Sequence, residues 1–245
     1  MMVSSRARFL AAAWAVFRKE LRVLFLSPLA WVFLAAFLFI GGMFFTLGIA
    51  MSGEASLRGV LANLGITLIF CLPLVTMRQL AEELGSGTLE LLLTSPVPLG
   101  ALILGKWAAA CALCGVLLAC TLPYAGVLLL FGDPDPGVLL TSYLGLAACC
   151  GAFSAAGLFA SSLTRDQMVA GVGGVLVLLP FWLAGSAGQL LPASLAPIAD
   201  RLSFIEHLRS FARGVLDSGD LVWFGGFTFV FLFLTWRVLE SRRWA

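Results

Sequence analysis

Long apolar runs alternate with short polar breaks along the whole chain. Six almost uncharged windows are long enough to cross a bilayer, since a membrane-spanning helix needs about 20 apolar residues. The pattern therefore predicts an all-α, polytopic membrane protein with six transmembrane helices, and a single transmembrane domain is expected to account for residues 1–245. The expected spans are residues 28–53, 59–77, 107–132, 137–164, 167–184 and 221–239.

Residues 1–27 precede the first span and form a basic amphipathic segment. Its apolar stripe at helical spacing consists of Leu10, Trp14, Phe17, Leu21 and Leu24. The basic side chains lie largely off this stripe, which predicts an interfacial helix on the cytoplasmic leaflet. A secretory signal peptide also starts with basic residues, but here charges at residues 18–20 replace the small-residue cleavage site, so we expect the segment to be retained.

Charged residues, glycine and proline gather in residues 78–106, between the second and third spans. A bilayer core does not tolerate Arg78, Glu82 and Glu83 without partners, so the chain is expected to leave the lipid by Arg78. Everything else in the chain is consistent with a scaffold that holds this loop at one membrane surface.

A short helix is predicted inside this loop, over residues 89–94. Gly87 belongs to a flexible break before it, Thr88 can cap it, and Glu90 lies in its first turn, where the helix dipole favours an anion. Pro96 and the next proline end it. Four of its residues are leucines, which predicts that it lies on the membrane or docks into a groove on another protein.

Several short motifs carry a resemblance to a known family. They are Met77-Arg78, Ala81-Glu82-Glu83, Gly87-Thr88-Leu89-Glu90, Leu92-Leu93-Thr94-Ser95-Pro96-Val97 and Gly105-Lys106. Together they resemble the first cytoplasmic loop of permease subunits of type-2 ABC exporters, in particular the branch typified by gliding-motility and nitrous-oxide-reductase-maturation permeases. Residues 204–220 and the tail 239–244 are similar to the same branch.

The resemblance implies that this loop is a coupling helix that contacts a separate ATPase subunit. ATP and magnesium would then be bound by that partner, and this chain would bind no cofactor and hydrolyse no ATP. The implied working unit is a dimer of permeases with two ATPase copies. The expected ATPase-coupling interface consists of Arg78, Glu82, Glu83, Gly87, Thr88, Leu89, Glu90, Leu92, Leu93, Ser95 and Pro96, with a second, smaller contact at Arg165 and Asp166.

One motif inside the loop imitates a nucleotide site. Residues 100–106 have the G-x-x-x-x-G-K spacing of a phosphate-binding loop, but Trp107 follows where a Ser or Thr should reach magnesium. The intervening residues are apolar, and no strand precedes them. Lys106 is instead expected near the cytoplasmic end of the third span.

Residues 185–220 are apolar but interrupted by glycine and proline, which is typical of a re-entrant or interfacial segment; the family resemblance implies such helices at the outer face. An amphipathic helix is expected in its second half, with one apolar face consisting of Ile198, Leu202, Ile205, Leu208, Phe211 and Val215. The outer polar residues singled out here are Glu206, His207, Arg213 and Asp217. His207 is the only histidine, and we expect a structural role near Glu206 rather than metal binding.

Composition supports the membrane assignment and sets the orientation. Hydrophobic residues make up 61% of the chain and charged residues 11%, against roughly 25% charged in soluble domains. Eleven Lys and Arg side chains lie on the side of the two termini and residues 78–106, and four on the other, so both termini are expected in the cytoplasm of a bacterium with the chain in its inner membrane. The charges are dispersed along the chain, which gives no indication of nucleic-acid binding. All six cysteines lie in apolar runs, so metal or redox chemistry is not expected.

The window 137–164 is rich in small residues, which predicts a helix central to the bundle. Two other classes remain open. An integral-membrane enzyme would need convergent polar groups within the spans, and an ion-coupled secondary transporter would need intramembrane charges; both are scarce here. Within the exporter interpretation, the expected partners are the ATPase, a second permease, membrane lipid and an accessory protein on the outer face.

Overall fold

The computed structural model describes residues 5–52, 58–94, 97–131, 135–187, 192 and 196–243. Within these ranges all regular structure is helical. The helices are α1 (Ser5–Leu26), α2 (Pro28–Ser52), α3 (Arg58–Gly85), α4 (Thr88–Thr94), α5 (Leu99–Phe131), α6 (Pro136–Leu163), α7 (Gln167–Ala187), α8 (Ala196–Leu202), α9 (Phe204–Ala212) and α10 (Ser218–Arg243). The predictions for Ser95 and Pro96 lie outside the described residues, as does the side chain of Leu93.

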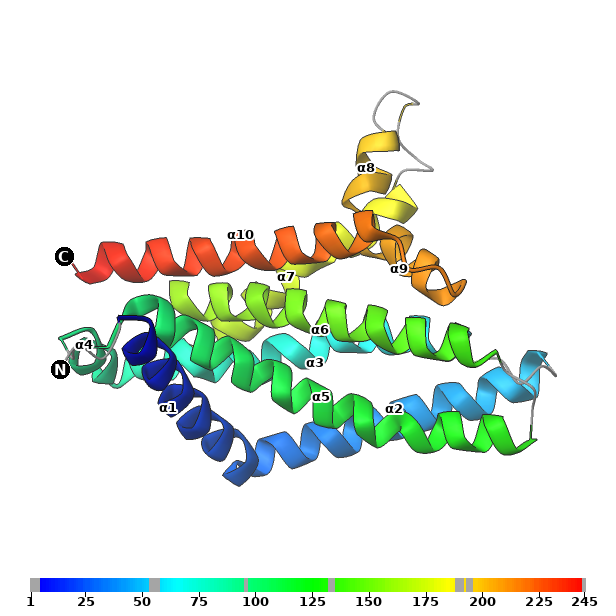
Figure 1. The fold of residues 1–245 in the computed structure, drawn as a ribbon, viewed down its shortest axis with the longest axis horizontal. Helices are drawn as coiled ribbons and strands as arrows, with labels where there is room; N and C mark the ends of the chain where they lie inside the picture. Colours follow the sequence, from blue (N-terminus) through cyan, green and yellow to red (C-terminus); the bar gives the residue numbers. More distant parts are fainter. Residues whose placement is uncertain are drawn as a thin grey trace.

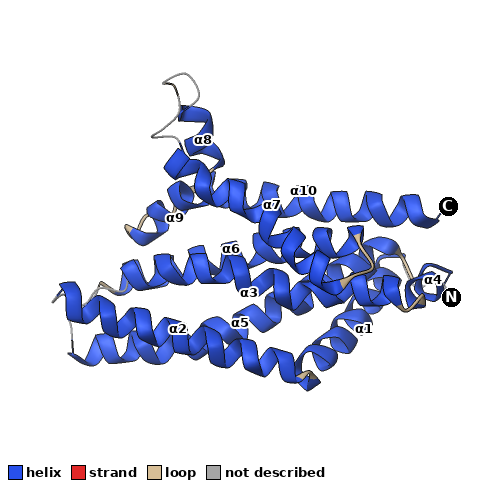
Figure 2. Ribbon diagram, turned by 180° about the vertical axis from the view of Figure 1, so that it is seen from behind, coloured by secondary structure: helices blue, strands red, loops and turns tan. Residues whose placement is uncertain are grey.

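The described helices form an elongated bundle with α4 and the chain ends at one end (Figure 1). Six of them are long and apolar enough to cross a membrane, which confirms the predicted number: α2, α3, α5, α6, α7 and α10. Helices α8 and α9 lie away from the α4 end, beside the start of α10, in both views (Figure 2).

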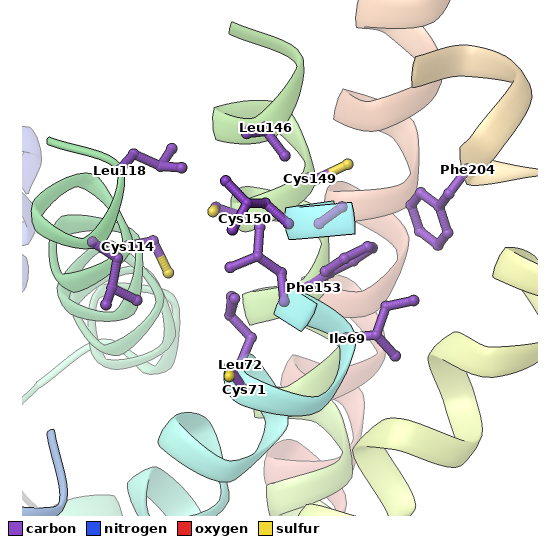
Figure 3. Close-up of a cluster of buried hydrophobic side chains, with 14 of the residues drawn as sticks. Ile69, Cys71, Leu72, Cys114, Leu118, Leu146, Cys149, Cys150, Phe153 and Phe204 are labelled. Atoms are coloured by element: carbon purple, nitrogen blue, oxygen red, sulfur yellow. The ribbon is translucent and has the colours of Figure 1, made fainter. Parts of the chain in front are cut away.

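Helix α6 lies at the centre of the bundle, as its small residues predicted. It packs against α3, α5, α7, α9 and α10, and most extensively against α3. The core around it includes Cys149, Cys150 and Phe153 of α6, with Leu72 of α3 and Cys114 of α5 close by (Figure 3). Small side chains allow helix backbones to approach closely in lipid, where dispersion contacts replace the hydrophobic effect between helices.

The closest packing joins α3, α6 and α7 around the proline of α3. A Cβ atom added at Gly174 of α7 would lie 2.7 Å from Cβ of Pro73, and one added at Gly157 of α6 would collide with the hydroxyl of Thr76. A side chain at either position would not fit, so both residues must be glycine.

Two helices extend well past the expected spans into the loop 78–106. Helix α3 continues to Gly85, and α5 already begins at Leu99, eight residues before the expected start of the third span. Charged side chains mark where a helix leaves lipid, but they do not end it, because the backbone hydrogen bonds continue. The remaining span boundaries agree with the helices to within a few residues.

Helix α1 presents the first residues of its predicted apolar stripe away from the bundle. Leu10 and Trp14 are 67% and 60% exposed. The opposite face packs against α5, where a Cβ atom at Gly105 would lie 2.8 Å from the carbonyl oxygen of Ala13 and from Cβ of Val16. The helix therefore has two apolar faces, one against protein and one available to membrane, and only the second was predicted.

Ile205, Leu208 and Phe211 of the apolar face expected after residue 196 pack against the core, but the prediction of one continuous helix is wrong. Ser203 separates α8 from α9, so that the two helices turn different faces to the bundle. Ile198 and Val215 are exposed, whereas Phe204, which lay outside the predicted face, is completely buried. Phe204 packs edge-on against Phe153 and Trp223, and these aromatic contacts replace the expected continuous stripe.

Candidate functional site

The candidate site is the end of the bundle formed by α4, the last turns of α3 and the first turns of α5 and α1. A sharp turn connects α3 to α4 at Gly87, whose φ of 72° lies in the left-handed region that favours glycine. The Ser86 hydroxyl donates to the carbonyl oxygen of Glu82 at 2.8 Å and lies 2.9 Å from the Thr88 hydroxyl. Thr88 is thus part of α4, where its hydroxyl stabilises the turn instead of serving as the predicted cap.

Helix α4 has an inner and an outer face. Leu89 is 2% exposed and belongs to a cluster with Leu80 and Leu84 of α3 and Ile103 of α5. Leu92 packs against the edge of the same cluster. This differs from the expectation that Leu89 fills a groove on another protein, because this side chain anchors α4 to its own bundle.

The outer face of α4 carries Glu90 and Leu91. Leu91 is 73% exposed, and Glu90 is exposed beside it. Leu91 was not among the predicted contact residues. Residues 89 and 91 are two positions apart and therefore point to different sides of a helix, so both could not face the same partner.

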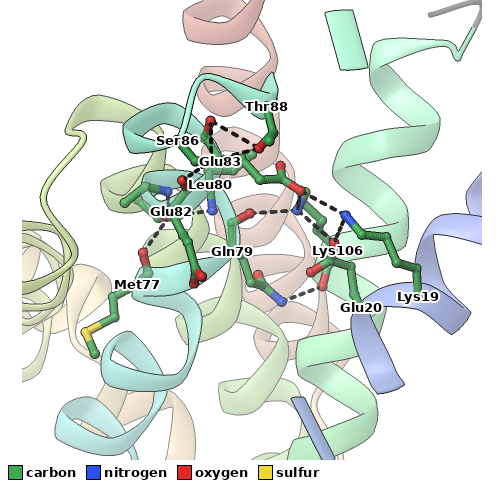
Figure 4. Close-up of polar contacts among 12 residues, drawn as sticks. Lys19, Glu20, Met77, Gln79, Leu80, Glu82, Glu83, Ser86, Thr88 and Lys106 are labelled. Carbon is green, nitrogen blue, oxygen red and sulfur yellow. Dashed lines mark hydrogen bonds and ion pairs between the residues drawn. The ribbon is translucent and has the colours of Figure 1, made fainter. Parts of the chain in front are cut away.

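A buried ion-pair network lies directly beneath this helix (Figure 4). The Lys106 ammonium lies 2.9 Å from a carboxylate oxygen of Glu20, 2.9 Å from one of Glu83, and donates to the carbonyl oxygen of Gln79 at 2.6 Å. Three oxygens therefore match the three N–H donors of a lysine. The Lys106 side chain is 1% exposed, and the network joins α1, α3 and α5.

Lys19 of α1 completes the network at its surface. Its ammonium lies 3.1 Å from Glu83 and 3.3 Å from Glu20, so two cations face two carboxylates. Burial lowers the pKa of Lys19, but the Glu20 and Glu83 carboxylates more than reverse this, and its pKa is raised. The stabilisation from this lysine is therefore complete below the usual lysine pKa and is lost only as the pH rises through the raised value.

The network changes the interpretation of Glu83. The sequence predicted that Glu82, Glu83 and Glu90 pair with basic residues on another protein, but Glu83 is already paired within its own chain. Glu82 and Glu90 keep exposed side chains. The phosphate-loop spacing at 100–106 is also explained, because these residues lie within α5 and their lysine is a buried partner of Glu20 and Glu83.

Ser161 of α6 holds the last turns of α3. Its hydroxyl donates to the carbonyl oxygen of Met77 and accepts from the backbone N–H groups of Leu80 and Ala81 at 2.9 and 3.0 Å. A side chain that enters the hydrogen-bond ladder of a helix fixes that helix to its neighbour. Sequence reasoning missed Ser161 because one serine in an apolar window gives no signal of this contact.

The turn between α6 and α7 lies at the same end as α4. A Cβ atom added at Gly85 would lie 3.1 Å from the carbonyl oxygen of Arg165, which places the predicted second contact beside the end of α3. Asp166 accepts hydrogen bonds from the backbone N–H groups of Met168 and Val169, so it also caps α7. Arg165 and Asp166 are both exposed.

The polar residues that were expected at the outer face form local contacts and not one site. Glu206 pairs with Arg209 at 2.6 Å, Arg213 ends α9, and Asp217 accepts from the backbone N–H of Gly219. A structural role near Glu206 was expected for His207, and its ring contacts other residues. Its Nδ1 lies 2.6 Å from Asp220 and its Nε2 3.1 Å from the carbonyl oxygen of Arg201, while its ring stacks on Trp223.

The family comparison agrees with this architecture. A model of the ABC-2 family transporter proteins matches residues 14–236, nearly the whole chain, and the chain belongs to that family. It is thus the membrane permease component of an ABC-2 transporter, a multi-pass membrane protein without ATPase activity of its own. No curated protein matches the chain.

Proposed function

We propose that this chain is the permease of an ATP-driven exporter and that α4 is the element through which a separate ABC ATPase moves it. ABC-2 permeases typically pair with such an ATPase. One observation carries the proposal: α4 is fixed to the bundle through buried Leu89 while it presents Glu90 and Leu91 outward. A helix that is packed against its own bundle on one face and exposed to solvent on the other is suited to bind a partner protein.

The contacts beneath α4 supply a path for the motion. A displacement of α4 acts on the ends of α3 and α5 through the cluster around Leu89, and the ion pairs of Lys106 extend it to α1. Ser161 extends it from α3 to the central α6. ATP-driven closure of the ATPase pair would bias the permease between two arrangements of these helices, which is the form that coupling between distant sites takes.

The remaining features of the assembly belong to the same proposal. Two permease copies act with two ATPases, which bind the ATP and magnesium. The excess of Lys and Arg on the α4 side favours a cytoplasmic location for α4 and both termini, in a bacterial inner membrane. The loop motifs favour the gliding-motility and nitrous-oxide-reductase-maturation branch, where the outcome would be cargo movement or mechanical work on an outer partner.

The experiment is co-purification of the ATPase with a tagged permease. Leu91→Asp places a charge on the outer face of α4 and is expected to abolish recovery of the ATPase while membrane insertion and thermal stability remain unchanged. Leu216→Asp is the matched control, because Leu216 is also an exposed leucine but precedes α10 at the other end of the bundle. Full recovery of the ATPase with the Leu91 variant would overturn the proposal.

A further inference from the structure

A small cavity with both polar and apolar walls lies where α1 bends into α2 against α3. Its volume is about 120 Å³, and its walls include Glu20, Arg78, Gln79 and Glu82 together with apolar side chains such as Leu24 and Val75. Arg78 and Glu82, the next charged residues of α3 after Arg58 at its start, lie here, next to the elbow between α1 and α2. The cavity is therefore at the level where a helix passes from lipid to water, the level of phospholipid headgroups.

One buried acceptor in its wall has no donor. Gln79 is 4% exposed, and its Nε2 donates to the carbonyl oxygen of Lys106 at 3.0 Å. Since only the nitrogen of an amide can donate, Oε1 is the other atom, and it has no partner among the described residues. A buried acceptor without a donor costs about 1–3 kcal/mol, so the geometry indicates a ligand that brings N–H or O–H groups.

Charges of both signs face the same cavity without pairing. Arg78 and Glu82 are one helical turn apart on α3, and within the described part of the chain neither forms an ion pair. Residues four apart lie about 5–6 Å from each other on a helix. A zwitterion of similar length, with its cation at Glu82 and its anion at Arg78, satisfies both groups at once.

We infer that this cavity binds the headgroup of a phospholipid with a primary amine, an ethanolamine phospholipid. The ammonium donates to Gln79 Oε1 and to the Glu82 carboxylate, and the phosphate binds the Arg78 guanidinium. The acyl chains continue along the apolar wall at Leu24 and Val75. The Trp31 indole N–H donates to the carbonyl oxygen of Phe25 at 2.9 Å and holds the elbow beside the cavity, where tryptophan is typical of a membrane interface.

The chemistry of the wall selects against other common lipids. A choline headgroup has no N–H donor for Gln79, and quaternary ammonium groups are usually bound by aromatic cages, whereas the described residues that line this cavity include no aromatic side chain. A glycerol headgroup brings no cation for Glu82. The inference is independent of the coupling role of α4, because it requires only that α1 and α3 meet at a membrane surface.

The test is lipid binding by the purified full-length chain, measured by native mass spectrometry without ATPase or nucleotide. Ethanolamine, choline and glycerol phospholipids with identical acyl chains are added to delipidated protein. The ethanolamine lipid is expected to bind on the order of tenfold more tightly than the choline lipid, the factor that corresponds to one hydrogen bond to a charged group. Equal binding of the two lipids, which a water-filled cavity would give, overturns the inference.

Variants assign the preference to this cavity. Glu82→Gln is expected to remove the preference, and Arg78→Gln to weaken both lipids; both side chains are exposed and unpaired within the described residues, so the fold should persist. Gln79→Met removes the buried acceptor Oε1 and should reduce the preference for the ethanolamine lipid. Glu240→Gln, which removes an exposed carboxylate on α10, should leave the preference intact. Soluble phosphoethanolamine should compete only weakly with the ethanolamine lipid. Competition as strong as that of the lipid itself would contradict the inference. So would an unchanged lipid preference in Glu82→Gln.

Discussion

Lys106 near the start of α5 and Glu83 in the last turn of α3 form an ion pair of 2.9 Å in which the lysine side chain is almost completely buried. The two residues flank α4 in the sequence, so their pairing closes the loop that presents this helix. Glu20 of α1 contacts the same ammonium, and Lys19 supplies the second cation that balances the two carboxylates. The apolar cluster around Leu89 and the ion pairs of Lys106 therefore connect the helices at this end of the bundle. We expect a displacement of α4 to be transmitted to α1, α3 and α5 together.

Removing the central cation should destabilise this end strongly. Lys106→Met leaves the Glu20 and Glu83 carboxylates buried without their main partner, and breaking a buried pair in this way costs about 3–5 kcal/mol. The measurement is thermal unfolding of the purified permease in detergent. Lys19→Met is the matched control: its side chain is 57% exposed, so a loss of about 1 kcal/mol or less is expected. Equal losses in both variants would contradict the central position of Lys106.

A methyl group at Gly174 should disturb the packing of α7 on α3. Its Cβ atom would lie 2.7 Å from Cβ of Pro73, and the rigid ring cannot move aside. Overpacking of this kind costs about 1–3 kcal/mol, measured as a lower unfolding temperature of Gly174→Ala. Gly225→Ala on α10 provides the control, because nothing lies within 4 Å of the added atom and alanine favours the helix. Similar melting of the two variants would argue against this packing.

The His207–Asp220 pair should respond unequally to substitution of its two members. His207→Ala leaves a largely buried carboxylate without its ring partner, and α9 should loosen from α10 at a cost of about 1–3 kcal/mol. Asp220→Asn is expected to be milder, since the amide can donate to Nδ1 of a neutral ring whose Nε2–H still donates to Arg201. Hydrogen–deuterium exchange of residues 204–212 measures the loosening. Faster exchange in Asp220→Asn than in His207→Ala would contradict this arrangement.

The sequence predicted the parts of the fold that follow from local patterns. Apolar windows identified the six long helices, small residues identified α6 as central, and the glycine before Thr88 together with the leucines after it identified α4. These features depend on the composition of single continuous stretches of the chain, so they are visible without knowledge of the neighbours.

The features that the sequence did not reveal depend on which side of a helix faces a neighbour. Leu89 is buried and Leu91 exposed because α4 lies across the ends of α3 and α5, which the spacing of leucines alone cannot specify. Glu83 and Lys106 are 23 positions apart, and their pairing requires two helices that leave the membrane side by side. Phe204 was missed because the break at Ser203 rotates α9 relative to α8.

The central claim is that the outer face of α4 meets an ABC ATPase, and site-specific photo-crosslinking in intact cells tests it most directly. A photoreactive amino acid at position 91 is expected to crosslink the permease to an ATPase subunit, with a yield that changes when ATP hydrolysis is blocked. The same probe at position 216, at the other end of the bundle, should give no such product. Crosslinks to an ATPase from position 216 and none from position 91 would contradict the account.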